Sequence, residues 1–314
     1  MPLSQSVSEL ESEIEGEIAQ LETRLAAAKA RLRTASASHG SVSWPSSLSL
    51  SPAPSSCSSP THFLLLLSDS ALPLGAFAFS SGLESFLAHN PRGPTFSSFL
   101  PLSLSSFAAT TLPFVLAAHR RPADLAALDD ELDATVVCTV GRRASIAQGR
   151  ALLSIWERSF RPALCPSAAA APPRPASSLV SSSSSTLLAE GDAILRAFAA
   201  LLKNTATRDI PSVSAHLAPL FGAICAFVGL DLGQTAYIFL LSHVKALISA
   251  AVRASMFGPY QAQKIVAGEQ VQRLIHDLVQ REWNTPVHEA GQSVPVMDLW
   301  IGRHELLYSR IFNS

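Results

Sequence analysis

The feature that most constrains the fold is a repeat of apolar side chains every three or four residues in the second half of the chain. One such stripe comprises Leu232, Ala236, Phe239, Leu240, Val244, Leu247 and Ala251. This spacing places all its members on one face of an α-helix, because a helix turns once in about 3.6 residues. Asp231 directly precedes the stripe, where a capping acid is favoured. We therefore expect a buried helix that begins after Asp231.

The same periodicity predicts further helices, with Pro211 and Pro259 placed where proline opens a helix. These helices are expected over residues 142–160, 187–203, 212–229 and 261–280. The one strand-like run, Thr135 to Val140, is too short and isolated to build a sheet. Only 15% of the residues are charged, against about 25% in an average soluble domain. These observations predict an all-α, multi-helix bundle with a second apolar layer.

The first 61 residues differ from the rest of the chain. Residues 1–33 carry an apolar stripe with glutamates toward its start and basic residues toward its end, which predicts an amphipathic helix that is either a packing helix or a short coiled coil. Residues 34–61 are rich in Ser and Pro and predict a disordered linker. An all-helical domain is expected over residues 62–314. A Ser/Ala/Pro-rich insertion at about 162–186 within it is expected to be mobile.

Charge and hydropathy argue against several classes of partner. The formal net charge of -1 provides no field that would attract nucleic acid. The apolar stretch Ala218 to Leu230 ends at Asp231, short of the roughly 20 residues that a membrane span needs, so no membrane is expected. The first residues lack the basic start and apolar run of a signal peptide, so we expect a cytoplasmic protein.

Sequence motifs for catalysis are missing. The chain has no Gly-Lys dipeptide and hence no P-loop, and residues 75–82 read G-A-F-A-F-S-S-G, which is not the G-x-S-x-G elbow of a serine hydrolase. Its nine histidines and four cysteines show no metal-binding spacing. We expect neither catalysis, nor a metal site, nor a directly bound cofactor. The alternatives are a small-molecule serine hydrolase with an unrecognised Ser, His and Asp set, and a self-associating helical structural protein.

Two segments do not have the pattern of ordinary core. The first, residues 63–84, joins an apolar run to a loop that carries Phe77 and Phe79 between two glycines. The second, residues 298–314, keeps aromatic residues and Arg310 almost to the chain end, where termini are usually polar. Aromatic residues and arginine are the usual mix of binding hot spots. Each segment therefore either packs on the chain's own core or forms a contact surface.

At these two segments the sequence resembles the urease accessory protein UreF family. Members of that family carry a run that closes with L-P-x-G-x-F-x-x-S-x-G-L-E and end with H-E-x-x-Y-S-R-L-F-x-S, and the matching segments here are residues 64–84 and 304–314. Two shorter blocks, residues 149–153 and 216–222, lie between them in the expected order. The resemblance covers residues 62–314 apart from the insertion.

The resemblance implies an all-α, non-catalytic homodimer that binds a second accessory protein, UreD (also called UreH). Together these proteins recruit the GTPase UreG and assist nickel insertion into apo-urease, with an influence on GTP hydrolysis. Nickel and GTP would act through the partners. Loop-shaping roles carry over to Pro73, Gly75 and Gly82. Partner-binding roles carry over to Phe77, Phe79, Glu84, His304, Glu305, Tyr308, Ser309, Arg310 and Phe312.

The sequence departs from the family pattern at two of the matched positions. Phe77 stands where some relatives have Tyr, which removes a hydroxyl, and Asn313 replaces a residue that is frequently basic. The N-terminal helix and the linker have no counterpart in the family pattern. The resemblance therefore implies nothing about their role.

Overall fold

The computed structural model of the chain describes residues 59–90, 93, 95–164, 182–205 and 211–313. Every regular element within these ranges is helical and none is a strand, which confirms the predicted all-α fold. The chain divides into one unit of residues 1–55 and another of residues 56–314, and the described residues all belong to the second. The predicted N-terminal helix and residues 34–58 of the predicted linker lie outside the described ranges.

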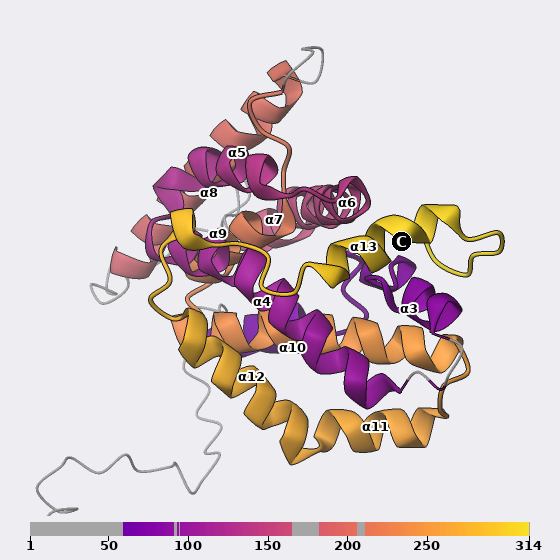
Figure 1. The fold of residues 1–314 in the computed structure, drawn as a ribbon. Helices are drawn as coiled ribbons and strands as arrows, with labels where there is room; N and C mark the ends of the chain where they lie inside the picture. Colours follow the sequence, from indigo (N-terminus) through magenta and orange to yellow (C-terminus); the bar gives the residue numbers. More distant parts are fainter. Residues whose placement is uncertain (1–58, 91–92, 94, 165–181, 206–210, 314) are drawn as a thin grey trace, which may run out of the picture. The chain divides into compact units, whose positions relative to one another are not determined.

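The second unit is built from helices around one apolar core (Figure 1). A short 3-10 turn (Ala76–Ala78) precedes α3, one turn of π-helix (Trp156–Phe160) follows α6, and a second 3-10 turn (His304–Leu306) follows α13. The helices are α2 (Pro60–Ser68), α3 (Leu83–His89), α4 (Phe96–Arg120), α5 (Leu125–Thr135), α6 (Thr139–Ile155), α7 (Arg161–Leu164), α8 (Ser182–Thr205), α9 (Leu217–Phe227), α10 (Leu232–Arg253), α11 (Pro259–Ala267), α12 (Glu269–Glu282) and α13 (Val296–Arg303).

Helix α4 is the central element, and it packs against α9, α10 and α12. Its contact with α9 is close, because a Cβ atom added at Gly222 would lie 2.2 Å from the carbonyl oxygen of Val115. On the α10 side, Phe107 stacks on Phe239 with ring centroids 5.0 Å apart. Small and flat side chains thus bring three helices together around α4.

The start of α10 confirms its prediction. Asp231 Oδ1 accepts the N–H of Gln234 at 2.7 Å, and Gln234 Oε1 accepts the N–H of Asp231 at 3.1 Å, which forms a complete capping box. Pro259 likewise opens α11 as expected. The predicted single helix over residues 261–280 is wrong, because the chain is extended at Gly268 and divides it into α11 and α12.

Other predicted limits also need correction. The helix expected from residue 212 begins only at Leu217, because the preceding backbone is held in another conformation by a buried carboxylate described below. Helix α2 begins at Pro60, inside the predicted linker. Helix α7 and the first turn of α8 occupy both ends of the predicted insertion, so a composition rich in Ser, Ala and Pro does not prevent helix there. Residues 165–181 lie outside the described ranges.

Helices α4 and α10 are both long and apolar enough to cross a membrane. The apolar stretch considered in the sequence, residues 218–230, belongs to neither helix. Within the most apolar windows of these helices, 67% and 61% of the residues are buried inside the unit. Burial of this extent is typical of the core helices of a bundle.

Candidate partner-binding surface

The two unusual segments identified from the sequence lie against each other in the folded unit. Helix α13, yellow in Figure 1, packs against both α3 and α6. Trp300 of α13 meets the ring of Phe86 of α3 edge to face, with centroids 4.9 Å apart. Residues more than two hundred positions apart are thereby brought together at one place.

The carboxylate of Glu84 holds the chain end, residues 304–313, which we refer to as the tail. Its Oε2 accepts a hydrogen bond from His304 Nε2 at 2.9 Å, and its two oxygens accept the N–H groups of Ile311 and Phe312 at 2.7 and 3.3 Å. The Glu84 side chain is only 12% exposed. Hydrogen bonds to an ionised acceptor are among the stronger ones in proteins, so Glu84 is the main polar anchor of the tail.

Phe312 is the apolar anchor at the far end of the tail. It is 5% exposed, and the guanidinium of Arg253 on α10 lies over its ring at 4.3 Å. The same guanidinium donates to the carbonyl oxygen of Phe77, so one cation contacts both segments. The N–H of Asn313 donates to the carbonyl oxygen of Ala78 at 2.8 Å and closes this end of the contact.

Gly82 lies where the loop approaches α13 most closely. Its φ is +87°, and an added Cβ atom would lie 3.1 Å from Ile301 Cγ1 and 3.2 Å from the Ile301 nitrogen. A side chain there would be strained by its backbone conformation and would also push α13 away. Gly75 also has a positive φ of +73°, but an added Cβ atom would find nothing within 4 Å, and Pro73 nearby is exposed.

Between the buried residues His304 and Phe312 the tail faces outward. Tyr308 is 107% exposed, Leu306 78% and Ile311 62%, although these are apolar or aromatic side chains. Ser309 and Arg310 are exposed as well. We define the tail surface as Glu305, Leu306, Tyr308, Ser309, Arg310 and Ile311.

The structure thus divides the predicted partner-binding residues. Glu84, His304 and Phe312 lie inside the chain and hold the tail, and the predicted residues between 305 and 310 are on the tail surface. Glu305 forms an ion pair with Arg143 of α6, in which both side chains are substantially exposed. The two loop aromatics, Phe77 and Phe79, are half-buried. Contact of any of these residues with a partner stays a prediction.

A second polar cluster, not predicted from the sequence, joins α5 to the start of α9. Asp129 of α5 is fully buried, and its carboxylate accepts the N–H groups of Ser214, Ala215 and His216 at 2.6, 2.9 and 2.6 Å. These three bonds satisfy backbone donors that would otherwise be buried without partners. They also fix the backbone before Leu217, which is why α9 begins there.

His216 continues this cluster into α6. Its ring is buried, with Nε2 2.8 Å from Asp133 Oδ1 and Nδ1 3.0 Å from Ser145 Oγ. Arg142 donates to both oxygens of Asp133 at 2.6 and 2.7 Å. Burial by itself raises the pKa of Asp133, but the hydrogen bonds from Arg142 and His216 outweigh it and hold the pKa below its usual value.

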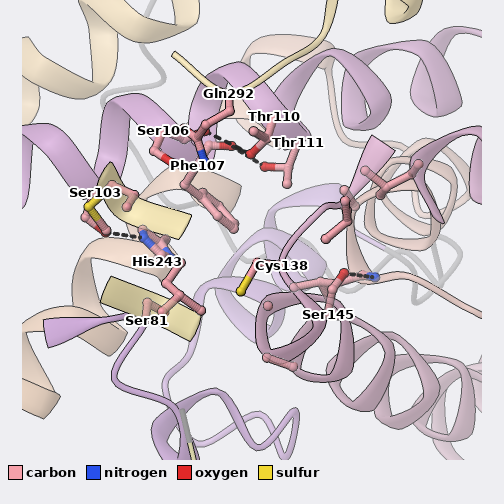
Figure 2. A pocket seen from close by; sticks show the side chains of 18 of the residues that line it. Ser81, Ser103, Ser106, Phe107, Thr110, Thr111, Cys138, Ser145, His243 and Gln292 are labelled. Carbon is pink, nitrogen blue, oxygen red and sulfur yellow. Dashed lines mark hydrogen bonds between the residues drawn. The ribbon is translucent and has the colours of Figure 1, made fainter. Parts of the chain in front are cut away.

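Ser145, His216 and Asp133 are the three residue types of a serine hydrolase, and Ser145 lines a cavity (Figure 2). Two features oppose a catalytic role. Ser145 lies inside α6, where neighbouring N–H groups are used by the helix. The N–H groups of residues 214–216, the nearest turn that could stabilise an oxyanion, are already bonded to Asp129. A buried network that fixes three helices explains the arrangement.

The two serines of the sequence motif do not form a hydrolase site either. Ser80 is fully buried, and Ser81 lines the cavity with a φ of +49°. Within the described ranges, no three His, Cys, Asp or Glu side chains gather closely enough to hold a metal ion. The tail surface is therefore the feature of the described chain that best fits a functional site.

Comparison with known proteins finds similarity to urease accessory proteins. A family model described as UreF matches residues 94–270, which include α4 to α11 but neither the Glu84 loop nor the tail. The chain is 36% identical over 256 residues to an uncharacterized urease accessory protein UreF-like of Schizosaccharomyces pombe, covering 81% of this chain and 97% of that protein. It is 31% identical to urease accessory protein F of Oryza sativa, covering 78% and 82%. It is 29% identical to urease accessory protein UreF of Paenarthrobacter aurescens, covering 79% and 95%.

Proposed function

Since the chain belongs to the UreF family of urease accessory proteins, we propose that it serves urease maturation as a non-catalytic scaffold. Its tail surface binds a UreD-type accessory protein, and the pair recruits a UreG-type GTPase so that nickel reaches apo-urease. The chain acts as a homodimer in the cytoplasm, influences GTP hydrolysis by contact, and binds no cofactor itself.

One observation carries this proposal: buried contacts hold the tail from inside, while its aromatic and aliphatic side chains stay outside. Ordering a chain segment costs about 1–2 kcal/mol of backbone entropy per residue. Here Glu84 and Phe312 supply contacts that offset this cost within the chain. A preordered surface loses less entropy when a partner binds, so Tyr308 and Ile311 are well placed to serve as binding anchors.

Replacing Tyr308 by Ala tests the scaffold role. The substitution removes an exposed aromatic without touching the buried anchors, so the fold should persist while affinity for the cognate UreD-type protein falls at least about tenfold, as for a binding hot spot. The matched control is Tyr260→Ala on α11, because Tyr260 is 93% exposed but lies outside the tail surface. Co-elution in gel filtration and calorimetry measure the affinity. Equal binding by both variants would contradict the proposed surface.

A second candidate, a serine hydrolase, is favoured by the contact of Ser145 with His216 and of His216 with Asp133. A fluorophosphonate probe followed by mass spectrometry distinguishes the two functions. We expect no adduct on Ser145, because the N–H groups of residues 214–216 are already bonded to Asp129 and those around Ser145 belong to α6. An adduct that disappears in Ser145→Ala would favour the hydrolase over the scaffold.

A further inference from the structure

A cavity of about 290 Å³ lies between α4, α6, α10 and α13, and it is not part of the proposed scaffold contacts (Figure 2). Its volume is roughly twice that of the ~150 Å³ cavity in which another protein holds benzene. A molecule with two fused rings therefore fits it. Leu74, Phe107, Met297 and Ile301 contribute apolar wall, and an apolar wall with a few polar groups is the usual form of a small-molecule site.

Three hydroxyl groups of the wall offer hydrogen-bond acceptors to a ligand. The hydroxyl of Thr110 donates to the carbonyl oxygen of Ser106 at 2.8 Å, one turn earlier in α4. The hydroxyls of Thr111 and Ser242 donate in the same way within their own helices. Each hydroxyl has a single proton, so these three oxygens have only lone pairs left for a ligand.

His243 adds an uncharged ring to the same wall. Its ring stacks on Phe107 with centroids 3.9 Å apart, and its Nε2 lies 3.2 Å from Ser103 Oγ. Burial lowers the pKa of His243 to about 3, so the ring is neutral at pH 7. His243 is partly accessible and lines the cavity.

The charge of the wall limits the ligand further. Among the described residues that line the cavity there is no Lys or Arg, and Asp298 is the one charged side chain. The amide groups of Gln148 and Gln292 are neutral donors, so the described wall has no cation to compensate a negative charge, which is costly to remove from water. The acceptor oxygens, by contrast, match a ligand that donates hydrogen bonds.

We propose that this cavity binds a small molecule of up to about two fused rings that donates hydrogen bonds and carries no negative charge. The donor group bonds to an acceptor oxygen of the wall, such as that of Thr110, and the apolar body contacts Phe107 and Met297. Such a site is separate from the tail surface, so a ligand bound there is not required for the scaffold contacts.

The methionines offer a direct measurement on the intact chain. The sequence has three, of which Met297 is 1% exposed and lines the cavity, and Met256 does not line it. With methyl-¹³C methionine, titration with indole should shift the Met297 resonance in a saturable way and leave Met256 unchanged. Benzothiophene, which has the shape of indole without its N–H, should bind about fivefold more weakly because one hydrogen bond is lost. Indole-3-carboxylate should not shift Met297.

Variants link the binding to the proposed acceptors. Thr110→Val keeps the side-chain shape and should weaken indole binding about fivefold without changing benzothiophene binding. The control is Thr285→Val, because the Thr285 hydroxyl also donates to a carbonyl one turn earlier but lies away from the cavity. Ala246→Leu, whose longer side chain enters the cavity, should abolish binding of both probes while circular dichroism shows an intact helical fold.

Three results would overturn the proposal. The first is the absence of any saturable Met297 shift with indole. The second is benzothiophene binding as tightly as indole, which would show that the acceptors play no part. The third is binding of indole-3-carboxylate as tight as that of indole, which would show that the wall does not discriminate by charge.

Discussion

One carboxylate determines where the tail lies. Glu84 accepts hydrogen bonds from the His304 ring and from two backbone N–H groups, and its own side chain is largely shielded from water. Glutamine has nearly the same shape, but it offers one acceptor oxygen and an NH₂ group that would face other donors. A buried donor left without an acceptor costs about 1–3 kcal/mol, which is enough to decide whether the tail stays docked.

Glu84→Gln should therefore release the tail without unfolding the helices. Trypsin cleaves after arginine, so cutting at Arg303 and Arg310 should become about tenfold faster, as expected for the loss of roughly 1.4 kcal/mol from the docked state. Mass spectrometry of the products measures the rates. The control is Glu305→Gln, which removes only an exposed ion pair and should leave the rates nearly unchanged. Equal protection in both variants would contradict the anchoring role of Glu84.

His243 should make stability depend on pH. Its pKa is about 3 in the folded chain and about 6.5 when unfolded, so below pH 6.5 the unfolded state binds a proton that the folded state does not. The free energy of unfolding should thus fall by up to about 1.4 kcal/mol per pH unit as the pH drops from 6.5 toward 3. His243→Phe keeps the stacking but cannot take up a proton.

Urea unfolding of both proteins at pH 5.5 and 4.5 tests this. The wild-type chain should lose about 1.4 kcal/mol more than His243→Phe over this interval. His119, whose pKa is lowered chiefly by burial, is present in both proteins, so its contribution cancels. Parallel losses in the two proteins would show that His243 takes up a proton equally well in the folded state.

The sequence identifies some residues of the site but not their contacts. Tyr308 and Arg310 stand out because aromatic residues and arginine together are the usual mix of a binding hot spot, and both are exposed. The bond between Glu84 and His304 spans 220 positions, and no local pattern reports such a separation. Asp129 did leave a local signal, since it lies among Leu125, Leu128 and Leu132 on the buried face of α5. A carboxylate on such a face requires buried donors.

At the scale of elements, the helices begin and end where capping residues and prolines predict, except where burial of apolar side chains outweighs these local signals. Asp231 and Gln234 are a local capping signal, and α10 begins as they predict. Helix α4 carries Pro101 and Pro113 in its interior, where a proline usually costs about 3 kcal/mol, and periodicity did not predict it. Its apolar residues, such as Phe99 and Phe114, are fully buried among other helices. This stabilisation depends on tertiary contacts that the local sequence does not show.

The contact of α3 with α13 should depend on Gly82 more than on Gly75. Alanine at either position adopts a left-handed backbone, which costs roughly 1–2 kcal/mol. Only at residue 82 would the new Cβ atom also approach Ile301, at 3.1 Å. Gly82→Ala should therefore destabilise the chain more than Gly75→Ala, and it alone should accelerate hydrogen exchange in α13. Equal exchange in both variants would show that α13 does not depend on the close approach at Gly82.

At the scale of the molecule, the folded unit brings the loop before α3 and the tail together. Its buried core includes Phe63 of α2 near the start of the described residues and Phe312 near their end. The family match covers the helices between these ends, whereas the loop and the tail that meet at Glu84 lie outside it. The helical scaffold thus positions two segments that are remote in sequence, and the composition of each segment alone does not predict that they meet.

Deletion of residues 1–58 tests whether this unit is sufficient. The deletion keeps Ser59 and Pro60, which begin α2, and keeps the buried Phe63 and Leu67. The helical signal per residue should persist and the melting temperature should change by less than about 2 °C, because a change of 1 kcal/mol shifts it by roughly 2–4 °C in a unit of this size. The proposed homodimer and the proposed affinity for a UreD-type partner should also persist in gel filtration.

A longer deletion, of residues 1–68, provides the contrast. It removes Phe63 and Leu67 from the core, and losing two large buried side chains typically costs several kcal/mol, so the melting temperature should fall by about 10 °C or more. If the shorter deletion instead yields a folded monomer, self-association belongs to the predicted N-terminal coil, and the self-associating structural protein becomes the better account. If that deletion keeps the dimer and the partner affinity, the surfaces that matter lie after residue 58, as the docked tail requires.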